Sequence, residues 1–206
     1  MKRRKIRSLS VSEIGMGCMG FSHGYGQVPG AGYAEEAIRE AFGYGCNFFD
    51  TAEGYGKELY YPGHNEEIVG RAVKGFRNEA VIATKLHIQP ETVEDCGSVY
   101  VAVRRHLERS LKNLQSDYVD LYYLHRINME VDYLEVAHAM GRLIQEGLVR
   151  EWGISTVDKA QLEAAHAVTP VGAVQNIYSM VERTSEKDVI PFCAVSYTHL
   201  TLPTKA

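Results

Sequence analysis

Four side chains suited to proton transfer stand at the ends of three short apolar segments of the sequence. Asp50 and Tyr55 lie in NFFDTAEGYG, Lys85 ends AVIATK, and His125 ends VDLYYLH. Parallel α/β folds place their chemistry where strands end. A phenol, an ammonium, a carboxylate and an imidazole that converge on one point suit the delivery of a proton to a carbonyl oxygen. Hydride transfer from a nicotinamide is the natural companion step, so the pattern predicts an enzyme.

These groups can converge only if the surrounding elements bring them together. The sequence alternates apolar strands with amphipathic helices at intervals of roughly thirty residues, the length of a βαβ unit. Ser98 is a candidate N-cap, and the residues after it show helical spacing at Val99, Val103, Leu107 and Leu111. Continuous apolar strands are typical of a parallel sheet whose two faces are both covered. We expect strands near residues 13–16, 47–50, 80–84, 119–124, 149–154 and 173–176.

A closed (β/α)₈ barrel of the TIM type accounts for this pattern better than an open doubly wound sheet. A doubly wound sheet gathers its site at one switch point, whereas here successive strand ends carry candidate functional groups. The KIRSLSVSEIG pattern near the start predicts that residues 1–12 include a short hairpin closing the bottom of the barrel.

Composition and charge argue against several classes of protein. The net charge is -4 and no basic stripe is present, so we expect no nucleic-acid partner. The basic start MKRRKIR is not followed by the apolar stretch of a signal peptide, and no run is long enough to span a membrane. The cysteines are isolated and lack metal-ligand spacing, so we expect no metal site and a reduced, cytoplasmic protein.

The segment GMGCMG imitates a dinucleotide-binding fingerprint. Gly15, Gly17 and Gly20 have the literal G-x-G-x-x-G spacing, but that fingerprint needs a helix to open at its last glycine. Here a loop follows, and the next helix is expected only near Tyr33. We therefore interpret the segment as a loop after the first strand, compatible with a backbone wall for a flat cofactor ring.

Several long segments together resemble the aldo-keto reductase family. They are IGMGCMGFS, NFFDTAEGYG, NEEIVGRAV, VIATK, SLKNLQSDYVDLYYLHR, GLVREWGIS and AVQNIYSMVER, and the match runs from about Lys5 to Cys193. The resemblance implies a (β/α)₈ barrel that binds NADPH at the carboxyl ends of its strands. It also implies the reduction of aldehydes and ketones, with a small carbonyl compound as substrate. The oligomeric state is not indicated.

The resemblance assigns a catalytic role to each of the four residues. Tyr55 corresponds to the general acid, and because a free phenol titrates near pH 10 it needs an adjacent cation, for which Lys85 is placed. Asp50 would pair with Lys85 and fix its position. His125 corresponds to the imidazole that orients and polarises the substrate carbonyl.

The resemblance also assigns cofactor-binding residues. Ser155 and Gln175 correspond to ligands of the nicotinamide carboxamide, and Thr156 stands where the family usually has asparagine. Gly17, Cys18 and Met19 correspond to backbone near the nicotinamide ribose, and Asp50 belongs to the same set. Two further interpretations stay open: Ser155 and Thr156 could cap the helix that starts near Asp158, and His23, Tyr25 and Trp152 could either touch substrate or serve only loop and packing roles.

Each candidate has an ordinary alternative when it is taken alone. Lys85 could extend from a strand end into water, His125 could be a structural histidine, and Asp50 could cap a turn. Tyr55 is one of 13 tyrosines. Their joint occurrence in family order favours the site.

The end of the sequence departs from the family. Eight βα units need about 250 residues, whereas about six strands are expected in these 206 residues. From about Val195 the sequence reads VSYTHLTLPTKA, which resembles translated adapter or vector sequence. We therefore expect residues 1–195 to be a partial barrel and residues 196–206 to be a non-native tail. Strands seven and eight, whose loops hold the cofactor phosphates in the family, would then be missing, which works against activity of this chain by itself.

A second class of function remains open. The channel-associated β subunits of this family use the same barrel as an interaction protein, in which bound cofactor modulates a partner. We favour the enzyme because nothing in the sequence indicates a docking face. Turnover of an aromatic aldehyde with NADPH distinguishes the two.

Overall fold

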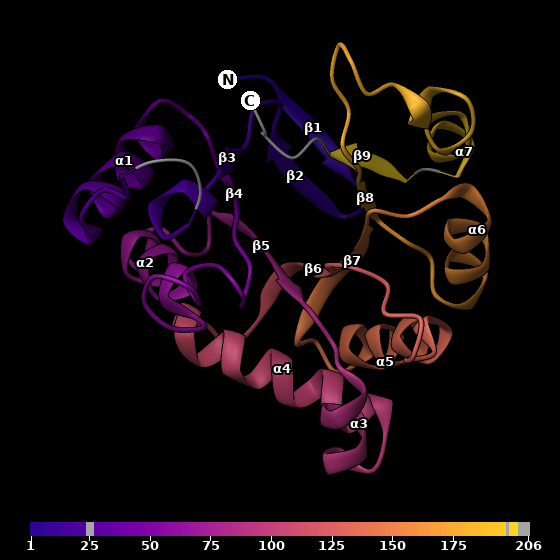
Figure 1. Cartoon of the computed structure of the whole chain (residues 1–206). Helices are drawn as coiled ribbons and strands as arrows, with labels where there is room; N and C mark the ends of the chain where they lie inside the picture. Colours follow the sequence, from indigo (N-terminus) through magenta and orange to yellow (C-terminus); the bar gives the residue numbers. More distant parts are fainter. Residues whose placement is uncertain (24–26, 197, 202–206) are drawn as a thin grey trace.

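The main sheet of the computed structural model curls as a partial barrel, with helices outside it (Figure 1). The structure describes residues 1–23, 27–196 and 198–201. Seven strands run in parallel and neighbour one another in sequence order. A doubly wound sheet would reverse its strand order at a switch point, so the barrel interpretation is confirmed. The strands are β3 (Met16–Gly17), β4 (Phe48–Asp50), β5 (Val81–Leu86), β6 (Val119–Leu124), β7 (Val149–Ser155), β8 (Ala173–Gln175) and β9 (His199–Thr201).

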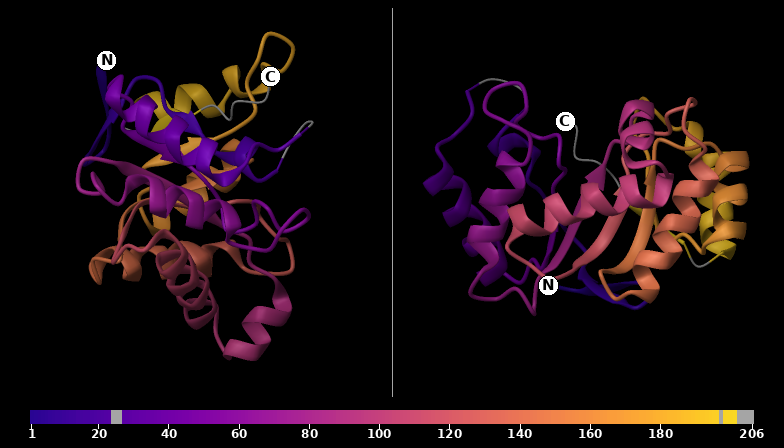
Figure 2. Two further views of the ribbon diagram at one scale, coloured as in Figure 1. Left: turned by 90° about the vertical axis from the view of Figure 1, so that its left-hand side faces the viewer. Right: turned by 90° about the horizontal axis from the view of Figure 1, so that it is seen from below.

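The helices lie on the outer side of the sheet, as the side view in Figure 2 shows. Local signals in the sequence set several of their ends. The Ser98 hydroxyl caps α4 by accepting from Val101 N, and Gly45 and Gly147 adopt left-handed conformations just after α1 and α5. The helices are α1 (Ala31–Gly43), α2 (His64–Val73), α3 (Pro90–Cys96), α4 (Val99–Leu114), α5 (Tyr133–Gln145), α6 (Lys159–Val168) and α7 (Val189–Val195), with single 3₁₀ turns η1 (Met19–Phe21) and η2 (Thr184–Glu186).

The two faces of the sheet pack against different partners because side chains alternate along a strand. Outward residues such as Ile82, Tyr122 and Trp152 join the core shared with the helices. Inward residues such as Leu121 and Tyr123 form a second core with the hairpin of β1 (Arg3–Ile6) and β2 (Leu9–Ser12). The hairpin lies across the end of the sheet opposite the strand-end loops (Figure 2, right). The predicted hairpin is therefore confirmed.

Gly153 makes room inside the sheet for the Tyr123 ring. A Cβ atom at position 153 would lie 2.4 Å from Cε1 of Tyr123, well inside van der Waals contact. The two residues are paired in register on β7 and β6. The absence of a side chain at 153 lets an aromatic ring fill the inner face directly beneath the strand ends.

The GMGCMG segment has the expected structure, whereas the C-terminal tail does not. The short turn η1 overlaps the last two residues of GMGCMG, and α1 begins at Ala31, so Gly20 opens no long helix and the dinucleotide fingerprint is rejected. In contrast, the tail contains a strand that we did not expect. His199 N donates to Gly172 O at 2.9 Å, and β9 pairs with β8. Backbone pairing with an open strand edge needs no side-chain period, which explains why the sequence pattern missed β9.

Among the described residues, no helix has both the length and the apolar character needed to cross a membrane. The four cysteines are free, and three of them are buried.

Candidate active site

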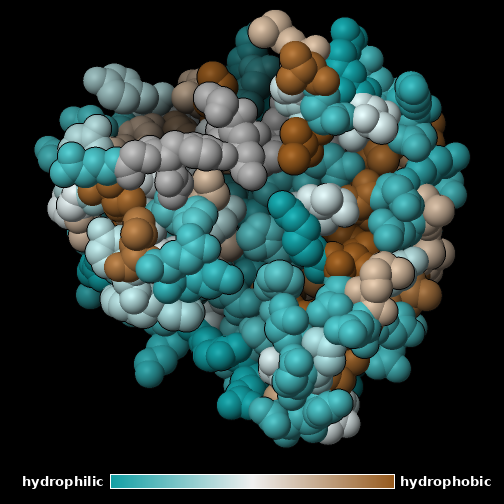
Figure 3. Space-filling view, in the orientation of Figure 1, coloured by the Kyte–Doolittle hydropathy of each residue, from teal (hydrophilic) through white to brown (hydrophobic). Residues whose placement is uncertain are grey.

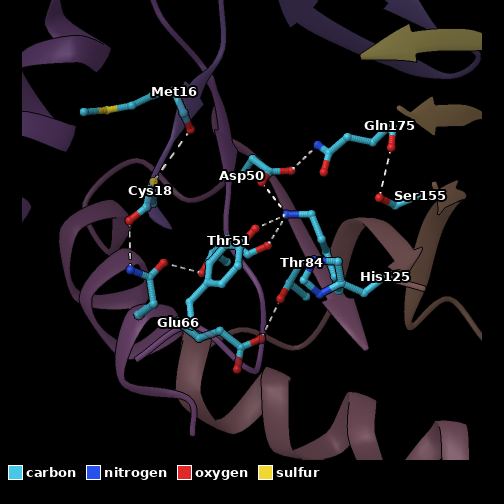
Figure 4. Close-up of polar contacts among 12 residues, drawn as sticks. Met16, Cys18, Asp50, Thr51, Glu66, Thr84, His125, Ser155 and Gln175 are labelled. Atoms are coloured by element: carbon cyan, nitrogen blue, oxygen red, sulfur yellow. Dashed lines mark hydrogen bonds and ion pairs between the residues drawn. The ribbon is translucent and has the colours of Figure 1, made fainter. Parts of the chain in front are cut away.

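Strand alternation and register bring the predicted residues to one end of the inner face. Asp50 closes β4, Ser155 closes β7, and Gln175 closes β8, with Ser155 and Gln175 directly paired. Lys85 lies one residue before the end of β5. Like Ala83, two positions earlier, its side chain points to the inner face of the sheet. His125 follows β6, and its N–H donates to Leu86 O at 2.9 Å. Side chains from β4, β5, β7 and β8 and from the loop after β6 therefore meet here (Figure 4).

Lys85 is held by three acceptors and is completely buried. Its Nζ donates to Asp50 Oδ1, to Thr51 O at 2.7 Å, and to Tyr55 Oη at 3.3 Å. An ammonium has three N–H groups, so none is left over. The alternative that Lys85 extends into water is wrong, because the strand continues through Leu86 and turns the side chain inward.

The charge of Lys85 is stabilised in this setting. Burial lowers the pKa of the Lys85 ammonium, but attraction to Asp50 and to Tyr55 outweighs burial, so the pKa lies above its ordinary value. Lys85 is therefore a cation at neutral pH, in contact with the Tyr55 oxygen. A cation in that place stabilises negative charge on that oxygen.

The side chains of Tyr55 and His125 are neighbours in the site. Tyr55 lies in the turn after β4, and its ring meets the His125 ring edge to face, with centroids 5.9 Å apart and an interplanar angle of 83°. The Lys85 ammonium also lies 5.0 Å from the Tyr55 ring centroid. A phenol and an imidazole are thus presented side by side, which suits the binding of one substrate oxygen by two groups.

Gln175, Ser155 and Arg126 form a second polar group beside the first. Gln175 Nε2 donates to Asp50 Oδ2 at 3.0 Å, so Asp50 is held by Lys85 on one oxygen and by Gln175 on the other. Ser155 Oγ donates to the main-chain O of Gln175 at 2.9 Å and accepts from Arg126 Nη1 at 3.0 Å. The Ser155 hydroxyl keeps one lone pair for a further donor.

A cavity of about 280 Å³ opens over these groups. In the space-filling view the face at the strand ends is hollowed near its centre, and much of the hollow is hydrophilic (Figure 3). Asp50, Tyr55 and His125 line the cavity, whereas Lys85 does not line it and lies buried beneath it. It is lined by Gly17, Met19, Gly20, His23, Asp50, Tyr55, His125, Arg126, Ser155, Thr156, Gln175 and Ile177.

Cys18 contributes main chain rather than its side chain to the site. Cys18 N donates to Asp50 O at 2.8 Å, and the residue is fully buried. Burial, with repulsion from Asp50, raises the pKa of the Cys18 thiol far above its ordinary value. The thiol is therefore not a nucleophile, although its neighbours Gly17 and Met19 line the cavity.

The structure also decides between the open interpretations of Ser155, Thr156 and Trp152. Asp158 is itself the N-cap of α6 and forms a capping box with Gln161, so Ser155 and Thr156 do not cap that helix. Trp152 faces outward, with its indole N–H donating to Thr169 O at 3.2 Å, which makes it a packing residue. His23 lines the cavity, and Tyr25 lies outside the described residues.

Thr156 has an unusual backbone. Its φ is +56°, in the left-handed region that β-branched residues avoid. Asparagine tolerates this region well. The conformation gives a physical reason for the asparagine that the resemblance implies at this position.

Sequence reasoning missed two supporting residues. Arg126 lines the cavity directly after His125, and its position at a strand end was an available signal. Asn65 is fully buried at the start of α2, where it accepts from Thr51 Oγ1 at 2.6 Å and donates to Cys18 O at 2.9 Å. It therefore ties together the two segments that flank Asp50. No periodic pattern distinguishes such a residue from an exposed one.

Comparison with known proteins gives consistent matches. The model of the aldo/keto reductase family matches residues 13–196. A relative from Glycine max, described as a probable aldo-keto reductase 1, is 35% identical over 191 residues, which are 91% of this chain and 54% of the relative. The chain thus spans about half the length of this curated relative.

Solved structures match over nearly the whole chain. A thermostable aldo-keto reductase in complex with the inhibitor epalrestat has a TM-score of 0.83 and 30% identity, covering 97% of this chain and 71% of its own. The aldo-keto reductase from Klebsiella pneumoniae in complex with NADPH has a TM-score of 0.82 and 28% identity, with 99% and 68% covered. The holo form of a Bacillus halodurans aldo-keto reductase has a TM-score of 0.81 and 28% identity, with 98% and 65% covered. Because the family model covers most of the chain, the chain belongs to the aldo/keto reductase family.

Proposed function

We propose that this chain carries the active site of an NADPH-dependent reductase that converts aldehydes and ketones to alcohols. The observation that carries the proposal is the contact of 3.3 Å between the Tyr55 hydroxyl and the fully buried, fully bonded Lys85 ammonium. A phenol is a weak acid, and a fixed cation beside it favours the loss of its proton to a substrate.

The residues at the cavity fit a nicotinamide carboxamide, which both donates and accepts hydrogen bonds. Among the described residues, no group donates to the side-chain oxygen of Gln175, whose nitrogen is bonded to Asp50. Ser155 Oγ can accept one more bond after its contacts with Gln175 and Arg126. The solved Klebsiella pneumoniae relative with NADPH supports the same cofactor.

In the proposed reaction the protein delivers the proton. NADPH, when bound, supplies a hydride for the carbonyl carbon. His125 orients the carbonyl oxygen, and the Tyr55 O–H gives its proton to that oxygen, so the product is an alcohol. Lys85 stabilises the negative charge left on the Tyr55 oxygen. Asp50, itself held by Gln175, keeps Lys85 in place.

The test is turnover of an aromatic aldehyde, such as 4-nitrobenzaldehyde, by the chain with NADPH. Tyr55→Phe keeps the ring and removes the proton, so the rate is expected to fall by about two to four orders of magnitude. The matched control is Tyr61→Phe, whose hydroxyl is exposed and bonds Glu67. NADPH affinity, measured by fluorescence titration, should change little in either variant.

Three outcomes separate the interpretations. Turnover that depends on Tyr55 but not on Tyr61 supports the reductase. NADPH binding with no turnover favours the second candidate, a cofactor-binding interaction subunit on the same barrel. A Tyr55→Phe variant that keeps a third of the wild-type rate removes Tyr55 from the mechanism.

A further inference from the structure

Arg126 brings a positive charge to the cavity, and it forms no ion pair with an acidic side chain of the described residues. Its side chain is half-buried beside His125 and lines the cavity. None of the ion pairs between described residues includes Arg126. Arginine stays charged at every physiological pH. A partly desolvated cation without a counter-ion is a good binding partner for an anion.

The hydrogen-bond count shows which part of Arg126 is available. Nη1 donates to His125 O at 2.6 Å and to Ser155 Oγ at 3.0 Å, which uses both of its N–H groups. A guanidinium has five N–H groups in a planar fork. The three that remain, on Nε and Nη2, have no acceptor in the described part of the chain. The Nε and Nη2 edge can bond two carboxylate oxygens side by side.

The acidic residues around the cavity do not compensate this charge. Both oxygens of Asp50 are occupied, one by Lys85 and one by Gln175. Glu58 is 3.4 Å from the His23 ring and is 62% exposed, so it lies toward water. The interior of the cavity therefore favours a negatively charged group near Arg126.

We infer that Arg126 makes this site selective for carbonyl substrates that carry a carboxylate. The inference rests on the proposed function and deepens it, because it names the substrate class. Tyr55 and His125 receive the carbonyl, while Arg126, next to His125 in the chain, binds the carboxylate through its free edge. Its contacts to His125 and Ser155 hold the guanidinium still, so little further ordering is needed when the substrate binds.

The first experiment compares paired substrates in the same variant. Each of the three carboxybenzaldehyde isomers is paired with its carbamoyl analogue, which has nearly the same shape but no charge, and the isomers scan the distance between carbonyl and carboxylate. We expect the wild type to favour at least one carboxylate over its amide by about tenfold in kcat/KM. Arg126→Met should bring that ratio close to one, and Arg126→Lys should retain part of it because it keeps the charge without the fork.

The ratio separates selectivity from a structural role. If Arg126 only positions Ser155 and His125, its loss lowers the rate for both members of a pair and leaves the ratio unchanged. Arg105→Met is the matched control, because Arg105 is exposed on the outer helix α4. A wild-type ratio near one for all isomers, or a ratio that survives Arg126→Met, overturns the inference.

The second experiment does not depend on turnover. Binding of benzoate and of benzamide to the chain is measured by ligand-observed NMR. Benzoate should bind to the wild type and about tenfold more weakly to Arg126→Met, while benzamide should show no difference. Equal benzoate binding by both proteins, or no benzoate binding by the wild type, contradicts the inference. If neither aldehyde of any pair is reduced, the proposed function fails, and benzoate binding still decides the role of Arg126.

Discussion

Replacing Lys85 by Met should both remove activity and destabilise the fold, and adding Asp50→Asn should restore only the stability. Lys85 is fully buried, and the Asp50 side chain is 18% exposed. Met fills most of the volume of Lys85 but leaves Asp50 Oδ1, Thr51 O and the Tyr55 hydroxyl without the ammonium. Among the described residues, Gln175 Nε2 would be the remaining donor to the Asp50 carboxylate.

The expected loss of stability in Lys85→Met comes from the Asp50 carboxylate, which would be mostly buried and without its cation. Removal of one partner from a buried ion pair typically costs about 3 to 5 kcal/mol. The slight exposure of Asp50 places the expectation for Lys85→Met near the lower end, at about 3 kcal/mol. The double variant is uncharged at both positions, so we expect it to regain at least about 1 kcal/mol relative to Lys85→Met. It should remain inactive, because nothing then stabilises charge on the Tyr55 oxygen.

The dependence on pH adds a second signature. The pKa of Lys85 in the folded chain lies above 10.5, its ordinary value, so the folded state holds this proton more tightly than the unfolded state. The stabilisation from Lys85 is therefore fully present below about pH 10.5 and is lost as the pH rises through the higher folded-state pKa. Wild-type stability should fall in that alkaline range by more than the stability of Lys85→Met.

Urea unfolding of the wild type, both single variants and the double variant measures these quantities directly. Lys74→Met is the control, because Lys74 is exposed at the end of α2. The pairing of Asp50 with Lys85 is refuted if the double variant is no more stable than Lys85→Met alone.

Three further predictions concern other parts of the fold. Thr156→Asn should stabilise the chain by about 1 kcal/mol in thermal unfolding, because it relieves a left-handed β-branched residue, whereas an equal gain from Thr156→Val would exclude backbone strain as the cause. Burial raises the pKa of Glu66, so its contribution to stability is present below about 4.5, its unfolded value, and is lost as the pH rises through the folded-state pKa. Glu66→Gln should therefore gain stability relative to the wild type as the pH rises from about 4.5 toward neutrality, and a difference that does not depend on pH would contradict this. Deletion of residues 196–206 should change the melting temperature by less than about 2 °C, because β9 is a short edge strand that pairs with β8 at three positions. A larger loss would make the pairing of β9 with β8 a structural requirement.

The location of the candidate site could be predicted from the sequence because strand ends in a parallel sheet converge. Asp50, Tyr55 and His125 follow apolar strands in the sequence, and they line one cavity in the structure. Lys85 was expected just beyond a strand. It instead lies inside β5, where alternation buries its ammonium beneath the cavity.

Side-chain contacts between residues far apart in the chain could not be predicted from the sequence. Ser155 and Trp152 lie three positions apart on β7, so side-chain alternation turns Ser155 inward and Trp152 outward. The odd spacing could therefore have excluded Trp152 from the cavity. In contrast, nothing in the local sequence shows that Arg126 reaches Ser155 across 29 positions, or that Asn65 bridges Cys18 and Thr51. Such contacts depend on the register of neighbouring elements, which periodic patterns do not specify.

The most direct test of the proposed reaction is the transfer of deuterium from NADPH in which both hydrogens on the hydride-donating carbon are replaced by deuterium. The chain is incubated with this cofactor and an aromatic aldehyde, and the alcohol is analysed by mass spectrometry. We expect one deuterium on the carbinol carbon of the product from the wild type and from Tyr61→Phe, and about a hundredfold less labelled alcohol or lower from Tyr55→Phe. Unlabelled alcohol, or labelled alcohol formed equally fast by Tyr55→Phe, would contradict hydride reduction with Tyr55 as the proton donor.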